Sequence, residues 1–159
     1  MTDVAVPTSV NHAPDFSYLS RLEITRETTA EWLIRNMPYA DDGTMPVLIV
    51  APATKENVGL YADHLHKVQR AALRATDSVT PEILDRHRED DRVLYPTYVV
   101  KGWKNVRDGS NQPIAFTVEA CRAFIRRLPA WLFDKLRSFC EAPENFVFSN
   151  LDGSILGKG

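Results

Sequence analysis

The sequence lacks the motifs that would assign it a chemistry. It has two cysteines and four histidines, and it contains no Cys-x-x-Cys pair, no Gly-x-Ser-x-Gly and no glycine-rich phosphate loop. His64 and His66 stand two residues apart in an expected helix, so they point to different sides and do not form a metal-binding pair. The neighbouring acids at 89–91 fan apart on a helix in the same way, which argues against paired catalytic carboxylates. We therefore expect no catalytic residue, no cofactor and no metal, and a protein that is not an enzyme.

Strong charge and long apolar runs are also missing. The formal net charge of −2, from 21 acidic and 19 basic side chains, gives no general attraction to nucleic acid or to an anionic membrane. No run of about 18 apolar residues is present, and the N-terminus does not have the pattern of a secretory signal. Cys121 and Cys140 lie in apolar, helical surroundings, which favours reduced thiols in a cytoplasm. We expect neither a nucleic-acid partner nor a membrane partner.

What is present is the composition of one globular domain, with 44% hydrophobic and 25% charged residues. Residues 1–15 have no sustained periodicity and predict a flexible arm. Residues 149–159 are rich in glycine and serine and predict a flexible tail. The domain is expected over residues 16–148.

The first part of this domain predicts a β-hairpin at about 30–52. Four consecutive aliphatic residues at 47–50 stand between prolines and follow a turn-rich stretch at 41–44, with a further apolar run before it. A helix is then expected at about 54–75, because apolar residues recur there at spacings of three and four after Thr54.

Three more helices are expected. Thr80 and Pro81 start one over 81–94, which we expect Pro96 to end. Thr117 caps another over 118–128, and Pro129 interrupts the apolar stripe so that a separate helix follows over 129–142. The predicted fold class is mainly α with a small N-terminal antiparallel β-hairpin (α+β), arranged as an amphipathic helix bundle.

Trp103 ends an apolar segment, and the turn at Asp108 and Gly109 leads from it to Phe116 and the next helix. This arrangement predicts a packing device that docks the C-terminal helices on the rest of the fold.

Aromatic residues gather in the last third of the chain, where they serve either as core or as interface. Our candidates for partner binding are Trp131, Phe133, Phe146 and Phe148, the last two forming a hook after the final helix. A helix-turn-helix regulator of DNA is the less favoured alternative, because the would-be recognition helix after residue 80 carries more acids than arginines.

The order of motifs in residues 45–148 resembles that of small tail assembly chaperones of long-tailed bacteriophages and prophages, of the lambda short-form type. The residues that carry the resemblance are the stretch 89–95, Val99 to Trp103, Asp108-Gly109, the stretch 113–119, Leu128-Pro129 and Phe146, preceded by 46–54, Asn57 and Tyr61. Within it, Trp103, Asp108, Gly109, Phe116 and Pro129 form a signature of core and turn positions.

The resemblance implies a non-enzymatic helper in the cytoplasm of an infected bacterium. Such chaperones bind the tape measure protein and help recruit tail tube subunits, and self-association is possible among them. The alternative is a structural component of the virion, such as a head-tail connector, a tail terminator or an accessory tail protein.

Overall fold

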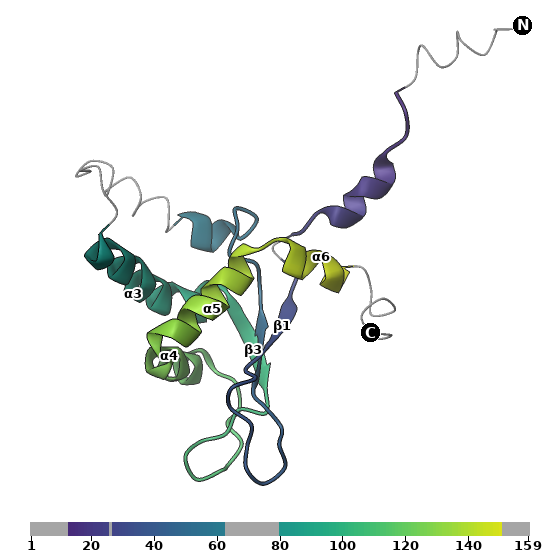
Figure 1. Cartoon of the computed structure of the whole chain (residues 1–159). Helices are drawn as coiled ribbons and strands as arrows, with labels where there is room; N and C mark the ends of the chain where they lie inside the picture. Colours follow the sequence, from purple (N-terminus) through teal and green to yellow (C-terminus); the bar gives the residue numbers. More distant parts are fainter. Residues whose placement is uncertain (1–12, 26, 63–79, 151–159) are drawn as a thin grey trace, which may run out of the picture.

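A three-stranded antiparallel sheet lies at the centre of the protein (Figure 1). The computed structural model describes residues 13–25, 27–62 and 80–150. The strands are β1 (Ala30–Leu33), β2 (Val47–Val50) and β3 (Val100–Lys104), in the order β1-β2-β3. Since β2 is central, its residue Leu48 pairs with Trp32 on one side and with Trp103 on the other.

Helices pack against this sheet. They are the 3-10 helix η1 (Ser17–Leu22) and the α-helices α3 (Pro81–Tyr98), α4 (Val118–Arg127), α5 (Ala130–Glu141) and α6 (Glu144–Asn150). The side chains of Thr80 and Thr117 accept hydrogen bonds from the backbone of α3 and α4, so both predicted caps are confirmed. Along the described ranges, no helix has the length and apolarity needed to cross a membrane.

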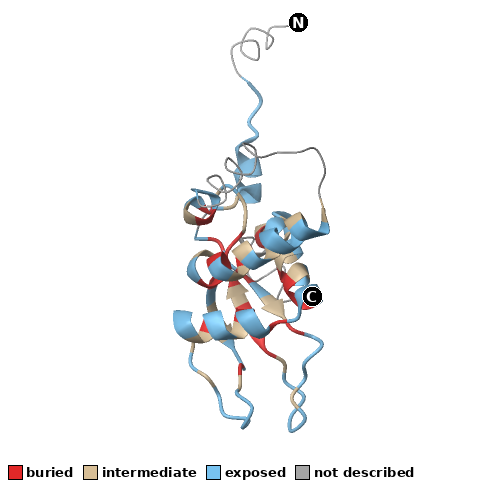
Figure 2. Ribbon diagram, turned by 90° about the vertical axis from the view of Figure 1, so that its left-hand side faces the viewer, coloured by how far each residue is buried: buried red, intermediate tan, exposed pale blue. Residues whose placement is uncertain are grey.

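The core lies between the sheet and the helices, where the buried residues gather in Figure 2. Leu48 and Val50 of β2 are fully buried. They share a cluster with Tyr95 of α3, Ile125 of α4, Phe133 and Leu136 of α5, and Phe146 of α6. In contrast, η1 has no buried residue and extends away from this body (Figure 1).

The prediction of a helix bundle with a two-stranded hairpin is wrong. The hairpin residues belong to a three-stranded sheet, because Val100–Lys104 pairs with β2 as a third strand, and the helices pack against that sheet. This segment gives a weak local signal, since it is five residues long, contains Gly102 and has an irregular register where it meets Ile49 and Val50. Its strand character comes from a distant partner.

Two further predictions need correction. Pro96 does not end its helix, because α3 continues to Tyr98 with Pro96 buried inside its last turn. The expected hook is a helix, since α6 begins directly after Pro143, a residue that favours helix starts. The break between α4 and α5 falls at Leu128 and Pro129. Most of the helix expected over 54–75, of which 58–62 are helical, lies outside the described residues, as do 1–12 and 151–159 of the expected arm and tail.

Trp103 joins the sheet to the C-terminal helices. Its ring contacts Phe116 and Phe124 at centroid distances of 5.1 and 5.6 Å, and its Nε1–H donates to the Ile114 carbonyl at 2.7 Å.

Trp103→Ala is therefore expected to lower the free energy of unfolding by roughly 3 kcal/mol, because it opens a void among these rings and removes the hydrogen bond. Trp103→Phe is the control, with an expected loss of about 1 to 2 kcal/mol, since it keeps a ring in place. Urea unfolding followed by circular dichroism measures both. Equal stability of the alanine variant and the wild type would contradict a core role for Trp103.

A side chain at residue 59 would contact Tyr98 closely, whereas one at residue 109 would not meet any neighbour. A Cβ at residue 59 would lie 2.6 Å from Cε1 of Tyr98, whereas a Cβ at Gly109 would meet nothing within 4 Å. We expect Gly59→Ala to destabilise the protein by roughly 1 to 3 kcal/mol through overpacking against Tyr98. Gly109→Ala should change stability by less than about 0.5 kcal/mol. Melting temperatures of the two variants provide the comparison, and equal values would show that Tyr98 moves aside freely.

Candidate functional site

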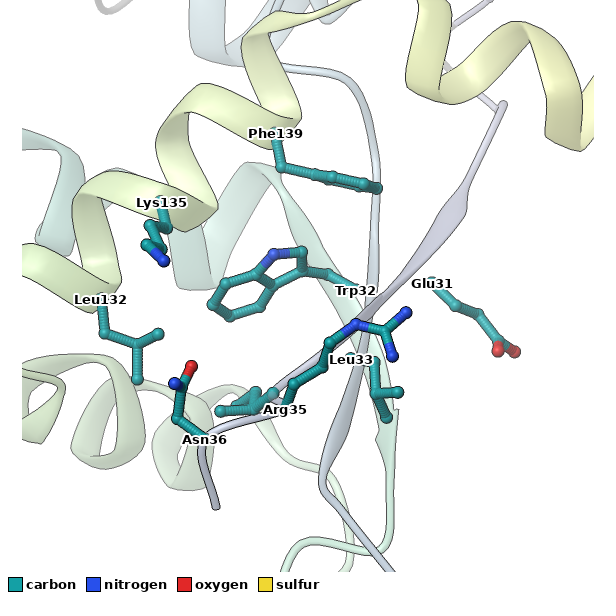
Figure 3. A pocket seen from close by; sticks show the side chains of 9 residues that line it. Glu31, Trp32, Leu33, Arg35, Asn36, Leu132, Lys135 and Phe139 are labelled. Carbon is teal, nitrogen blue, oxygen red and sulfur yellow. The ribbon is translucent and has the colours of Figure 1, made fainter. Parts of the chain in front are cut away.

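A cleft of about 320 Å³ lies between β1 and α5 (Figure 3). One wall comes from β1 and the turn that follows it, and the other comes from successive turns of α5. The residues that line it are Glu31, Trp32, Leu33, Ile34, Arg35, Asn36, Leu132, Lys135 and Phe139. The indole of Trp32 extends from β1 toward α5, below the ring of Phe139 (Figure 3).

The two tryptophans of the sheet have different surroundings. Trp32 and Trp103 flank Leu48 in one row across the strands. Trp103 is covered by Phe116 and Phe124, and its N–H is hydrogen-bonded. Trp32 is partly exposed at the cleft, and within the described ranges its N–H has no hydrogen-bond acceptor. Both indoles are partly exposed, but in the described part of the chain that of Trp103 packs against two aromatic rings and is hydrogen-bonded, whereas that of Trp32 borders the cleft.

The charged side chains at the cleft leave an excess of positive charge. Glu31 is already bound by Nζ of Lys104 at 2.5 Å. Arg35 and Lys135 are exposed, and neither has an acidic partner in the described part of the chain. Lys135 lies instead over the ring of Trp131, with its Nζ 5.6 Å from the centroid. Two cations, Arg35 and Lys135, thus lie beside the apolar residues that line the cleft.

Ion pairs with α3 fix the position of α5. Arg137 donates to the buried carboxylate of Asp91 at 2.8 Å and to Asp134 at 3.0 Å, while Arg88 binds Asp134 through two hydrogen bonds. The bonds from Arg88, and then from Arg137, hold the pKa of Asp134 below its usual value against the effect of partial burial. The carboxylate is therefore charged at neutral pH and keeps α5 in place.

A second network fixes the loop that follows β1. Arg107 donates to Asp41 at 2.8 Å and to Asp42 at 2.7 Å, and its guanidinium lies 4.2 Å from the centroid of the Tyr39 ring. The backbone N–H of Thr44, together with Arg107, lowers the pKa of Asp42 to about 2. The loops at the lower end of Figure 1 are thereby joined to each other.

The predicted partner-binding residues are placed very differently from one another. Trp131 is 52% exposed on α5, one turn before Lys135 of the cleft. Phe133 and Phe146 are fully buried in the core, so neither is available at the surface. Phe148 lies in α6. Trp131 therefore stands at the surface beside Lys135 of the cleft.

The predicted signature residues lie in packing contacts, at the start of a helix or in a turn. Trp103 and Phe116 pack on each other, and Pro129 precedes the first residue of α5. The Asp108 carboxylate accepts hydrogen bonds from the backbone N–H groups of Ser110 and Gln112, which closes the turn. Gly109 is exposed in that turn.

Buried reactive groups are not set up for chemistry. Burial raises the pKa of the Cys121 thiol to about 12 and, with the charge of Glu141 adding to it, raises that of Cys140 well above its usual value. Both thiols are therefore protonated and poorly nucleophilic. In the described ranges, no three histidine, cysteine or carboxylate side chains come together as metal ligands would.

The sequence patterns do not reveal the cleft. The apolar stripe on both sides of Pro129 contains Leu132 and Phe139, and the apolar run before 47–50 contains Trp32, but neither pattern brings these residues together. The available signal was the spacing of Leu132, Lys135 and Phe139, which puts three residues on neighbouring turns of one side of α5. The other wall could not be inferred, because it depends on how β1 meets α5.

Comparison with known proteins places the chain by family. The family described as "YdaY prophage protein" matches residues 55–154, which include α3 to α6 and β3 but not β1 or β2. No curated protein and no solved structure matches. The match supports the resemblance at the level of phage or prophage origin, and it does not reach the finer assignment to tail assembly chaperones. Since it spans more than half of the sequence, the chain belongs to the YdaY prophage protein family.

Proposed function

We propose that this protein is a non-enzymatic tail assembly chaperone of a phage or prophage, acting in the cytoplasm of the infected bacterium. It binds the tape measure protein and helps to recruit tail tube subunits during tail assembly. The observation that carries the proposal is the apolar cleft between β1 and α5, which is open at the surface of a chain from a prophage family.

The chemistry of this cleft suits a protein partner. Trp32 and Phe139 present partly exposed apolar surface next to the buried Leu132, and Trp131 adds an exposed aromatic ring beside them. Aromatic residues at a surface hollow are typical anchors of protein interfaces. A chaperone needs such a surface, because its task is to cover apolar segments of an unassembled partner.

A structural component of the virion is the second candidate. The observation that favours it is η1 together with the residue before it, since Phe16, Tyr18, Leu19 and Leu22 are all exposed within seven residues. An exposed apolar segment of this kind suits an arm that packs against neighbouring subunits in a finished particle.

Mass spectrometry of purified particles separates the two candidates. We expect the protein to be absent from finished virions, with the tail tube protein serving as the internal standard. We also expect the tape measure protein, produced together with this chain, to stay soluble and to co-purify with it. Stoichiometric presence of the chain in virions would instead support the structural role.

A gene deletion supplies the independent test. Without the chaperone, the infected cell should make heads but no complete tails, and the tape measure protein should be found in the insoluble fraction. Normal tails from the deletion strain would contradict both candidates.

A further inference from the structure

Strand β1 has a free backbone edge. The amide of Ile34 donates to the Pro46 carbonyl at 2.9 Å, and Trp32 lies opposite Leu48 in the same register. Because bonding alternates along an antiparallel strand, Glu31 and Leu33 direct their backbone N–H and C=O groups away from β2. No other described strand pairs with that side. These groups are therefore available to a further strand.

The cleft lies directly beside this edge, since β1 forms one of its walls (Figure 3). A strand that paired with β1 would direct every second side chain toward α5, because side chains alternate between the faces of a sheet. One such side chain would meet Trp32, Leu132 and Phe139. The four residues of β1 match a partner segment of roughly 13 Å.

Charge selects among the possible segments. Arg35 and Lys135 have no acidic partner in the described part of the chain, and Glu31 is already bound by Lys104. A segment with carboxylates would neutralise these two cations, whereas a basic segment would be repelled. A second copy of β1 is a poorer occupant, because it would bring another Arg35 together with a carboxylate that its own Lys104 holds.

We propose that the cleft between β1 and α5 binds an extended, acidic segment of a partner protein, which adds to the sheet as a fourth strand. The segment pairs its backbone with Glu31 and Leu33, places an apolar side chain against Trp32 and Phe139, and brings carboxylates within reach of Arg35 and Lys135. This rests on the proposed function in assigning the cleft to a partner protein, and it adds the binding mode and the chemistry of that partner.

A selection with random twelve-residue peptides on the immobilised full chain tests the proposal. We expect the selected peptides to share an aromatic or aliphatic residue flanked by aspartate or glutamate. A fluorescent copy of one selected peptide then gives the dissociation constant by anisotropy. In that peptide, methylation of the alternate backbone nitrogens that face β1 should abolish binding, because it blocks strand pairing.

Charge reversal on the protein supplies the matched variants. Arg35→Glu and Lys135→Glu should each weaken peptide binding at least tenfold, since both side chains are exposed and lie at the cleft. Lys101→Glu is the control, because Lys101 is also exposed but belongs to β3 at the opposite side of the sheet, and it should leave binding unchanged. Melting temperatures establish that all three variants are folded.

Several results would overturn the proposal. These are selected peptides without acidic residues, equal binding by Lys135→Glu and the wild type, or a failure to select any peptide. Light scattering that shows a dimer, lost in Arg35→Glu, would assign the edge to a second copy.

The outcome is separable from that of the proposed function. Tape measure protein that still co-purifies with Lys135→Glu would leave the chaperone role standing and refute this cleft. If acidic peptides bind as expected but no tape measure protein is retained, the binding mode of the cleft would stand and the chaperone role would be refuted.

Discussion

The pairing of β3 with β2 is the interaction on which the rest of the structure depends. It puts Trp103 beside Leu48, and through the contacts of Trp103 with Phe116 and Phe124 it attaches the loop and helix that follow. With β2 in the centre, Leu48 and Val50 are covered on both sides and become fully buried. A two-stranded hairpin alone is marginally stable in water, so the third strand turns a weak element into the foundation of the core.

Polar networks then fix the positions of the helices relative to this sheet. Asp91 is buried in α3, and its ion pair with Arg137 ties α3 to α5. The Ala53 N–H donates to the Cys140 carbonyl at 2.8 Å, which ties the C-terminal end of α5 to the segment after β2. A buried ion pair contributes little net stability against an apolar replacement, but it tolerates few alternative arrangements. The consequence is that the α5 wall of the cleft is held from two directions and is preorganised, which lowers the entropic cost of binding.

Local features of this fold could be predicted from the sequence, and features that depend on distant contacts could not. The caps Thr80 and Thr117 and the break at Pro129 are set by neighbours within one helical turn, and all three are found as expected. The strand at 100–104 was missed because its partner lies in β2, more than forty residues earlier in the chain. The prediction that Pro96 ends its helix was wrong for a related reason. Its buried position in the last turn of α3 is stabilised by tertiary packing, which local sequence rules do not include. The candidate site was the least predictable part, because its walls come from Trp32 and Phe139, which only the tertiary fold brings together.

The two edge strands of the sheet, β1 and β3, differ in how the chain covers the tryptophan that each carries, and this difference bears on the role of the β1 edge. The chain covers the β3 side with its own residues, since the segment after Trp103 returns to hydrogen-bond and pack against it. At the β1 edge the Trp32 indole, which is partly exposed like that of Trp103, has no such aromatic cover in the described part of the chain and borders a cleft. An exposed strand edge invites unwanted pairing between copies, and short strands and charged residues are the usual protection. Strand β1 has both, with four residues, Glu31 within it and Arg35 after its end. Those same charges oppose indiscriminate association and, with Glu31 held by Lys104, favour an acidic strand over others. The short, charged strand that resists pairing between copies is therefore also compatible with the acidic segment proposed above.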